Sequence, residues 1–207
     1  ALLAMDAEVV ARGPGGTRTI PLRELFQGPF VTSLEPTEII TEVRVPDPGQ
    51  AAGGTYLKLE RKVGDFATVG VAVHLAMADG KVGRAGIAMT AVGPTNLRAS
   101  AAEEALAGSE LTDDVIREAA RLAAEDAHPY SDTRGTVDYK RTVVRVFTER
   151  GLRTVAGRLG SAGGAPVTTE ASLEATERQG YFSGEDTVAG VMEELEEKPG
   201  GPDGGER

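Results

Sequence analysis

Two long strand-like segments that flank Asp79 and Gly80 constrain the fold of this chain more than any other feature. Residues 69–78 read VGVAVHLAMA and residues 82–92 read VGRAGIAMTAV, so both segments are rich in apolar residues. An Asp-Gly pair between two such segments is a strong signal for a β-hairpin. We therefore expect two neighbouring antiparallel strands in this part of the chain.

Further strands are predicted on the N-terminal side of this hairpin. Residues 6–12 and 17–20 flank the turn-forming sequence Gly-Pro-Gly-Gly and indicate a first, smaller hairpin. Residues 38–46 alternate in polarity and contain β-branched side chains, which predicts a strand that ends at Pro46. A short helical turn is expected at residues 21–26, where proline occupies the first position.

The helical part of the chain follows the strands. Three helices are expected, over residues 100–106, 112–127 and 136–159. Ser100 and Glu103 have the spacing of a capping box, and Thr112 is expected to cap the second helix. Gly151 is expected to weaken the middle of the third helix. Strands followed by helices, rather than alternating with them, predict an α+β fold.

The acidity of the chain belongs to its C-terminal tail. Residues 161–207 hold 11 Asp and Glu against 3 Lys and Arg, whereas the rest of the chain is nearly neutral. Neither part has the basic surplus of a nucleic-acid-binding protein. We expect residues 160–207 to be mostly disordered. Residues 183–197 carry apolar side chains on one face and fit an amphipathic helix against a partner, although a free, transient helix is favoured for so short a segment.

Composition excludes several kinds of site. The chain has no cysteine and two histidines, His74 and His128, so disulfides, Fe–S ligands and His-rich or Cys-rich metal sites are excluded. The lack of cysteine fits a reducing compartment, and we expect a cytoplasmic location. No apolar run approaches the ~20 residues that a membrane span needs. A phosphate loop, a nucleophile elbow and a dinucleotide-binding fingerprint are also absent from the sequence.

The densest polar segment is residues 56–68, YLKLERKVGDFAT. Because side chains alternate along a strand, Tyr56 and Lys58 are expected on one face and Leu57 and Leu59 on the other. The polar face is suited to a flat aromatic cofactor, with a tyrosine ring for stacking and a lysine for a carbonyl or a ring charge. A solvated strand edge, whose charges prevent pairing with other chains, explains the same residues without a ligand.

Three longer segments carry a resemblance to one protein family. They are LFQGPFVTSLEPTEIITEVRVP (25–46), YLKLERKVGDFATVGVAVHL (56–75) and SDTRGTVDYKRTVVRVFTERGL (131–152). In this order and spacing the chain resembles the FAD-binding medium subunit of the molybdenum hydroxylase family, of the aerobic carbon monoxide dehydrogenase and xanthine dehydrogenase type. The resemblance covers roughly residues 1–158.

The resemblance implies an organisation into three parts. Residues 1–46 correspond to the C-terminal end of the FAD-binding domain, and residues 53–159 to the flavoprotein C-terminal domain. In the family this C-terminal domain is a three-stranded antiparallel sheet packed on a helical bundle. Nothing in the family matches the acidic tail, residues 160–207.

The resemblance also implies a function in electron transfer. In the family, a large subunit with the molybdenum cofactor oxidises the substrate, and a small subunit carries two [2Fe–2S] clusters. The flavin subunit receives the electrons on FAD and passes them to an acceptor. We therefore expect an oxidoreductase subunit that is not active alone and that assembles with both other subunits.

Four residues of the chain match positions near the flavin in the family. Tyr56 matches a tyrosine near the isoalloxazine ring, and Lys58 matches a lysine that contacts the flavin. Ile40 matches an apolar position beside the flavin, and Asp65 an acidic position near the same edge. The resemblance thus implies an apolar wall, a ring face and a cation beside the negative charge of reduced flavin.

The chain departs from the family pattern in one respect. The two glycine-rich segments that wrap the FAD pyrophosphate in the family are absent, because the resemblance begins after both of them. We therefore expect a partial FAD site that needs a missing N-terminal lobe and does not bind FAD tightly alone. The alternative is a non-catalytic assembly or interaction module that has lost FAD binding.

Overall fold

The computed structural model describes residues 1–62 and 64–161, and all of them belong to one compact unit. The expected acidic tail, apart from its first two residues, and the expected helix at residues 183–197 lie outside the described residues. Within the described part, no helix is both long enough and apolar enough to cross a membrane.

The larger sheet is antiparallel and has the strand order β6-β7-β8-β9. Its strands are β6 (Ala52–Leu59), β7 (Val69–Ala78), β8 (Lys81–Thr90) and β9 (Leu97–Arg98). The predicted hairpin is confirmed, with Asp79 and Gly80 at φ values of 51° and 76° between β7 and β8. Both positive values match a two-residue hairpin turn. The three expected strands are present, and the short β9 extends the sheet on one side.

Strand β6 starts and ends three residues earlier than the sequence predicts. It begins at Ala52 and ends at Leu59, whereas residues 55–62 were expected. The strand ends there because the chain turns away from the sheet after Leu59. The backbone N–H of Thr68 then donates to the carbonyl of Leu59 (2.7 Å) and closes the loop over residues 60–68.

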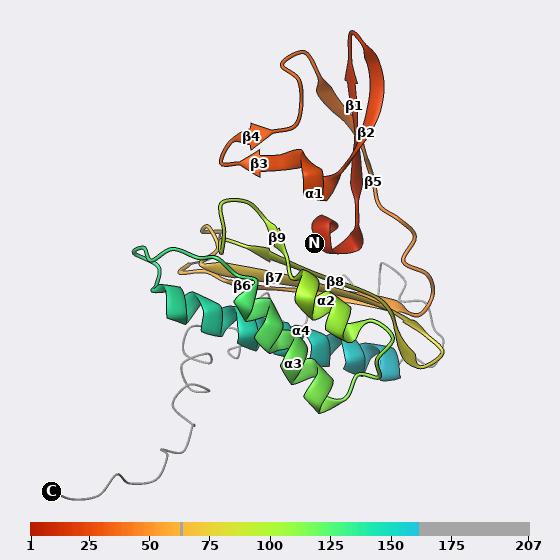
Figure 1. Ribbon diagram of the computed structural model, residues 1–207, viewed down its shortest axis with the longest axis vertical. Helices are drawn as coiled ribbons and strands as arrows, with labels where there is room; N and C mark the ends of the chain where they lie inside the picture. The colour runs from red at the N-terminus through yellow and green to blue at the C-terminus, as the bar shows by residue number, and fades with distance from the viewer. Residues whose placement is uncertain (63, 162–207) are drawn as a thin grey trace, which may run out of the picture. The chain divides into compact units, whose positions relative to one another are not determined.

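Three helices lie on one side of this sheet, as Figure 1 shows, and the second of them packs against the other two. They are α2 (Ser100–Leu106), α3 (Asp113–Glu125) and α4 (Val137–Ser161). Helix α4 packs against β6 and β7, and α2 packs against β8. Helix α4 runs through Gly151 without a break, and a Cβ atom at Gly151 would lie 2.8 Å from Cγ2 of Val73. The glycine therefore lets the helix approach the sheet closely.

One of the two expected helix caps is confirmed and the other is wrong. Thr112 Oγ1 accepts the backbone N–H of Val115 (3.4 Å), as expected of an N-cap. Helix α2 has Ala99 at its N-cap and no side-chain cap, so the capping box of Ser100 and Glu103 does not form. The Glu103 carboxylate instead accepts the backbone N–H of Ile87 on β8 (2.7 Å), so it binds the sheet and not the start of its own helix.

The N-terminal part contains the smaller strands. The sheet with order β2-β1-β5 consists of β1 (Glu8–Gly13), β2 (Gly16–Pro21) and β5 (Ile39–Arg44). These strands confirm the three that the sequence predicts here. Short elements lie around them, namely η1 (Leu2–Met5), α1 (Leu22–Leu25), β3 (Phe26–Gly28) and β4 (Val31–Thr32). The β3–β4 hairpin was not expected from the sequence.

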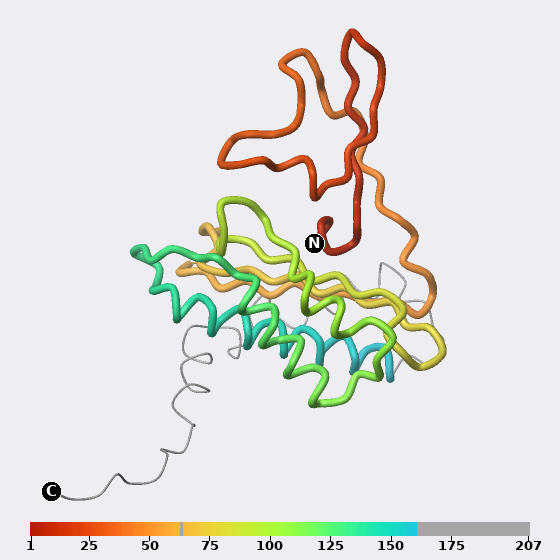
Figure 2. Tube along the Cα trace, in the orientation of Figure 1, coloured from red at the N-terminus to blue at the C-terminus, as the bar shows by residue number. Residues whose placement is uncertain are grey.

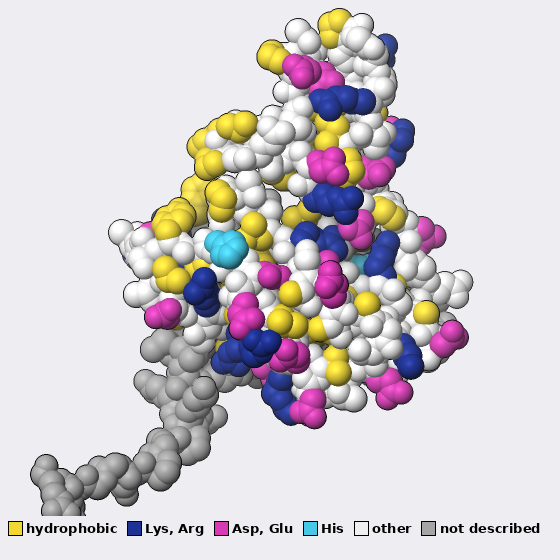
Figure 3. Space-filling view, in the orientation of Figure 1, with side chains coloured by type: hydrophobic (Ala, Val, Ile, Leu, Met, Phe, Trp, Pro, Cys, Tyr) yellow, Lys and Arg dark blue, Asp and Glu magenta, His cyan; other side chains and the backbone are white. Residues whose placement is uncertain are grey.

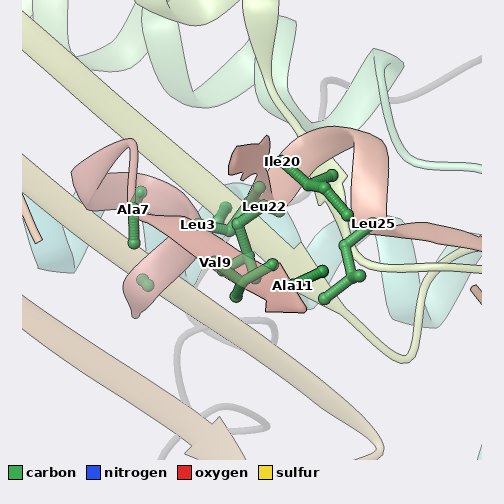
Figure 4. Packing of buried hydrophobic residues seen from close by; sticks show 10 residues of the cluster. Leu3, Ala7, Val9, Ala11, Ile20, Leu22 and Leu25 are labelled. Carbon is green, nitrogen blue, oxygen red and sulfur yellow. The ribbon is translucent and has the colours of Figure 1, made fainter. Parts of the chain in front are cut away.

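Segment η1 packs directly on the larger sheet. A Cβ atom at Gly86 of β8 would lie 1.8 Å from the backbone oxygen of Ala4, so only glycine permits this approach. Ala72 of β7 and Ala88 of β8 belong to one apolar cluster together with residues of the N-terminal part. Figure 4 labels residues of this cluster that come from the N-terminal part, which are Leu3, Ala7, Val9, Ala11, Ile20, Leu22 and Leu25.

A partly buried arginine stabilises the same contact. Arg98 of β9 donates to the carbonyl of Leu3 (2.6 Å) and to the Asp6 carboxylate (2.7 Å). The other side of its guanidinium forms two hydrogen bonds with Glu103, at 2.6 and 2.8 Å. Since a guanidinium presents its donors in a fixed fork, Arg98 sets the position of the N-terminal segment against β9 and α2.

Candidate functional site

Tyr56 and Lys58 lie on one face of β6, as their spacing predicts. The helices pack on the opposite face, where a Cβ atom at Gly151 of α4 would contact Leu57 Cδ1 at 3.3 Å. Leu59 is buried on that side. The alternation of side chains along β6 is therefore confirmed, and the polar pair lies on the face of the sheet that the helices do not cover.

The ring of Tyr56 leans over Gly70 on the neighbouring strand β7. A Cβ atom at Gly70 would lie 2.5 Å from Tyr56 Oη and 2.7 Å from Thr90 Cγ2. Gly70 therefore makes room for the phenol group beside Thr90. The tyrosine remains 48% exposed, and its partial burial raises the pKa of its hydroxyl. Such a half-exposed ring can stack against a flat ligand.

The ammonium group of Lys58 has two partners within the described residues. It donates to the backbone carbonyl of Asp65 (2.8 Å) and forms an ion pair with the carboxylate of Glu60. The contact with Glu60 is the main reason that the pKa of Lys58 is raised. Because an ammonium group carries three N–H donors and forms one hydrogen bond within the described residues, to the Asp65 carbonyl, it can still donate to a ligand.

The carboxylate of Asp65 binds Arg134 and the loop backbone, and it does not bind Lys58. It accepts two N–H groups of Arg134, at 3.0 and 3.2 Å, and the backbone N–H of Phe66 at 2.7 Å. The hydrogen bond from Arg134 is the main cause that lowers the pKa of Asp65. Asp65 therefore meets Lys58 through its carbonyl oxygen, while its side chain fixes the loop over residues 60–68.

Arg134 belongs to a second loop that is itself held by a buried lysine. The two loops, residues 60–68 and 128–136, meet at one end of the sheet in Figure 2, and Arg134 also donates to the carbonyl of Phe66 (2.7 Å). Lys140, only 2% exposed, pairs with Asp132 at 2.7 Å. It also donates to the carbonyl of Tyr130 (3.0 Å) and lies 5.0 Å from the centre of its ring.

Sequence reasoning assigned no role to Glu60, Arg134 or Lys140. Arg134 and Lys140 lie in the third family-like segment, SDTRGTVDYKRTVVRVFTERGL, which was the available signal. Glu60 lies beside Lys58 in the second segment and has the two-residue spacing of side chains on one strand face.

Ile40 lies in a different sheet from Tyr56 and Lys58. It belongs to β5, in the smaller sheet, where it pairs in register with Ala11 and is 37% exposed. All six residues of β5 are exposed, including Ile39 and Val43 at 67% and 49%. An edge strand with apolar side chains exposed on both faces is typical of a sheet that is covered by a partner.

The β3–β4 hairpin adds to the exposed apolar surface of the N-terminal part. Phe26, Phe30 and Val31 are large exposed hydrophobic residues there, and Figure 3 shows hydrophobic side chains gathered over this hairpin. Charged residues are spread over the rest of the visible face. The described residues contain no group of three or more His, Asp or Glu side chains that could hold a metal ion.

The chemistry of these residues fits the ring of a flavin but not its phosphates. Tyr56 offers a ring face, and Lys58 offers N–H donation and a positive charge. Residues 13–16, Gly-Pro-Gly-Gly, form the turn between β1 and β2. They therefore do not lie between a strand and a helix N-terminus, where a phosphate is usually bound.

Two family models match the chain. Residues 1–48 match the FAD binding domain in molybdopterin dehydrogenase, and residues 54–155 match the CO dehydrogenase flavoprotein C-terminal domain. The chain is 37% identical over 156 residues to the carbon monoxide dehydrogenase medium chain of Hydrogenophaga pseudoflava, covering 75% of this chain and 54% of that relative. It is also 37% identical over 152 residues to the 6-hydroxypseudooxynicotine dehydrogenase complex subunit alpha of Paenarthrobacter nicotinovorans, covering 73% and 51%.

Solved structures give the same result. Carbon monoxide dehydrogenase from Hydrogenophaga pseudoflava matches with a TM-score of 0.73 and 40% identity, over 76% of this chain and 55% of that chain. Quinoline 2-oxidoreductase from Pseudomonas putida 86 matches with a TM-score of 0.68 and 27% identity over the same shares. The chain thus spans about half the length of the relatives that it matches. It belongs to the family of FAD-binding medium subunits of molybdenum hydroxylases, of the carbon monoxide dehydrogenase and xanthine dehydrogenase type, and corresponds to their C-terminal part.

Proposed function

We propose that this chain supplies the ring-facing part of an FAD site in a molybdenum-containing oxidoreductase, and that the rest of the FAD-binding domain supplies the phosphate contacts. The observation that carries the proposal is the arrangement of Tyr56 and Lys58 on the face of β6 that the helices leave uncovered. Lys58 has a free N–H donor within the described residues and is held by the loop over residues 60–68.

The four residues have different roles in this proposal. Tyr56 offers its ring for stacking, and Lys58 places a cation near a ring carbonyl. Ile40 provides an apolar wall from the smaller sheet. Asp65 acts mainly through its backbone, because its carbonyl accepts from Lys58 while its carboxylate is bound by Arg134. When bound, FAD would supply the ability to take up and release electrons.

The exposed strand β5 supports the need for a further lobe. The family model for the FAD-binding domain covers only residues 1–48 of this chain, and β5 lies within that region with its apolar residues exposed. We propose that the N-terminal lobe of the FAD-binding domain covers this surface. The lobe would bring the two glycine-rich segments that the sequence lacks.

The proposed role in the whole enzyme is to pass electrons onward. Electrons would arrive from the [2Fe–2S] clusters of a small subunit and leave through FAD to an acceptor. A large subunit with the molybdenum cofactor would oxidise the substrate. The relatives support this assembly by name, since several are medium chains or subunits of dehydrogenase complexes.

FAD retention through a desalting column tests the proposal. The chain is mixed with FAD either alone or with the N-terminal part of the Hydrogenophaga pseudoflava medium chain that precedes the matched region. We expect stoichiometric FAD only in the assembly, and a loss of at least tenfold in affinity for Lys58→Met. The matched control is Lys81→Met, which removes an exposed lysine at the start of β8. Stoichiometric FAD on the chain alone, or no FAD on the assembly, would overturn the proposal.

The alternative function is an assembly or interaction module without FAD. The exposed apolar residues of β5 and of the β3–β4 hairpin favour an association of some kind. Association with an Fe–S subunit, measured with and without residues 161–207, tests whether the tail is needed for docking. If deletion abolishes assembly, the tail is a docking segment, and if assembly persists, it is dispensable for docking.

A further inference from the structure

Glu60 is a buried carboxylate that contacts Lys58. Its side chain is 7% exposed, whereas that of Lys58 is 33% exposed. The two residues are two positions apart, so their side chains lie on the same side of the chain. A buried carboxylate is costly unless a cation or hydrogen bonds compensate it, and Lys58 is the cation that it meets.

Within the described residues, no other carboxylate forms an ion pair with Lys58. The carboxylate of Asp65 is bound by Arg134, and only its backbone carbonyl accepts from Lys58. The Asp65 carbonyl therefore fixes one N–H of the ammonium, whereas Glu60 contacts the ammonium as its counter-ion. The buried Oε2 of Glu60 accepts no hydrogen bond within the described residues, so its contact with Lys58 acts through charge.

The pair also limits the positive charge that a ligand meets. An unpaired lysine would attract a negative ring much more strongly than a neutral one. With Glu60 beside it, the net charge of the pair is close to zero. The difference in affinity between a negative and a neutral ring then becomes smaller. The relative affinity for a charged and a neutral ring therefore depends on Glu60 as well as on Lys58.

We propose that Glu60 offsets the positive charge of Lys58 beside the flavin ring, and so sets how strongly the site prefers the reduced ring over the oxidised ring. The proposal rests on the ring-binding role proposed for Tyr56 and Lys58. It adds a residue and an electrostatic function that this role does not itself require.

The test compares reduced and oxidised FAD in the assembly of the full chain with the N-terminal part of the related medium chain. Dithionite supplies two electrons and the solvent supplies one proton, which convert the neutral oxidised ring into a reduced ring with one negative charge. The ratio of the two affinities follows from the reduction potential of bound FAD. The variants are Glu60→Gln, which removes the charge at constant size, and Glu60→Asp, which keeps it. The control is Glu104→Gln, at an exposed glutamate of α2.

Glu60→Gln is expected to shift the ratio toward the reduced ring by on the order of tenfold. For a two-electron couple this corresponds to a potential about 30 mV more positive. Glu60→Asp is expected to shift it less, and Glu104→Gln not at all. A circular dichroism melt checks that each variant is folded, and the pKa of Lys58 by NMR is expected to fall in Glu60→Gln.

The outcomes separate this inference from the proposed function. If FAD binds and its potential is the same in Glu60→Gln as in the wild type, the inference is wrong while the proposed function stands. A shift of equal size in Glu60→Asp and Glu60→Gln would also overturn it, because charge would then not be the cause. If the wild-type assembly holds no FAD, the proposed function and this inference both fail.

Discussion

The substitution Gly86→Ala tests how the N-terminal segment is attached to the larger sheet. A Cβ atom at Gly86 would lie 1.8 Å from the oxygen and 2.8 Å from the carbonyl carbon of Ala4. Both atoms belong to the backbone of η1, so no side-chain rotation relieves the overlap. The segment would have to move away by more than about 1 Å to restore an ordinary van der Waals contact.

The expected cost follows from the kind of contact. Overpacking of a well-packed core costs about 1–3 kcal/mol, and a backbone contact belongs at the upper end of this range. We therefore expect Gly86→Ala to lower the free energy of unfolding by about 2–3 kcal/mol. With a urea m-value of roughly 2 kcal/mol per M, the midpoint falls by about 1 M or more.

Urea unfolding and amide hydrogen exchange measure the effect. Exchange is expected to speed up most in residues 1–25, which form the cluster with Ala72 and Ala88. The control is Gly157→Ala on α4, where a Cβ atom meets nothing within 4 Å and alanine is expected to stabilise the helix by up to about 1 kcal/mol. A Gly86→Ala variant within about 0.5 kcal/mol of the wild type would refute the close-approach argument.

Three further predictions concern stability. Arg98→Met removes the donors to Leu3, Asp6 and Glu103 and is expected to cost about 2–4 kcal/mol in urea unfolding. The Arg98 side chain is 17% exposed, and its removal leaves the largely buried Glu103 carboxylate without its cation. Burial lowers the pKa of His74 below its ordinary 6.5. The contribution of neutral His74 to the free energy of unfolding is therefore full above pH 6.5 and is lost as the pH falls below that value. His74→Gln should therefore lose less stability than the wild type between pH 8 and pH 5. Gly151→Ala should destabilise by about 1–2 kcal/mol in thermal unfolding, despite the higher helix propensity of alanine, and a stabilised variant would contradict the packing of α4.

Local sequence signals predicted the elements whose structure depends on local chemistry. The Asp79–Gly80 turn adopts the backbone that an Asp-Gly pair favours, and the alternation around Lys58 placed the polar face of β6 correctly. Thr112 caps its helix because its hydroxyl oxygen accepts a backbone N–H three residues ahead. In each case, the partners lie within a few residues of one another.

Contacts between distant parts of the chain were not predictable in the same way. Arg134 reaches Asp65 across 69 positions, and nothing in either segment alone indicates the pairing. Glu103 had the right spacing for a capping box but binds Ile87 of the sheet and Arg98 instead. A local pattern is overridden when a tertiary partner offers a better-placed donor. The burial of Glu60 is of the same kind, since exposure depends on the packed fold.

The role of Gly151 illustrates the difference for a single residue. Helix propensity alone predicts a weak point in the middle of α4. The structure explains the glycine by its distance to Val73, because any larger residue would push the helix away from β7. Packing of this kind becomes visible only once the sheet and the helix are placed against each other.

In the proposed function, Tyr56 and Lys58 contact the flavin ring and not the phosphates. The most direct measurement compares the binding of riboflavin and FAD to the assembly with the N-terminal lobe, in the wild type and in Lys58→Met. Because only the ring contact is removed, the account predicts that both ligands lose affinity by the same factor, of about tenfold. An unchanged affinity for riboflavin together with a weaker affinity for FAD would place Lys58 at the phosphates and would contradict the account.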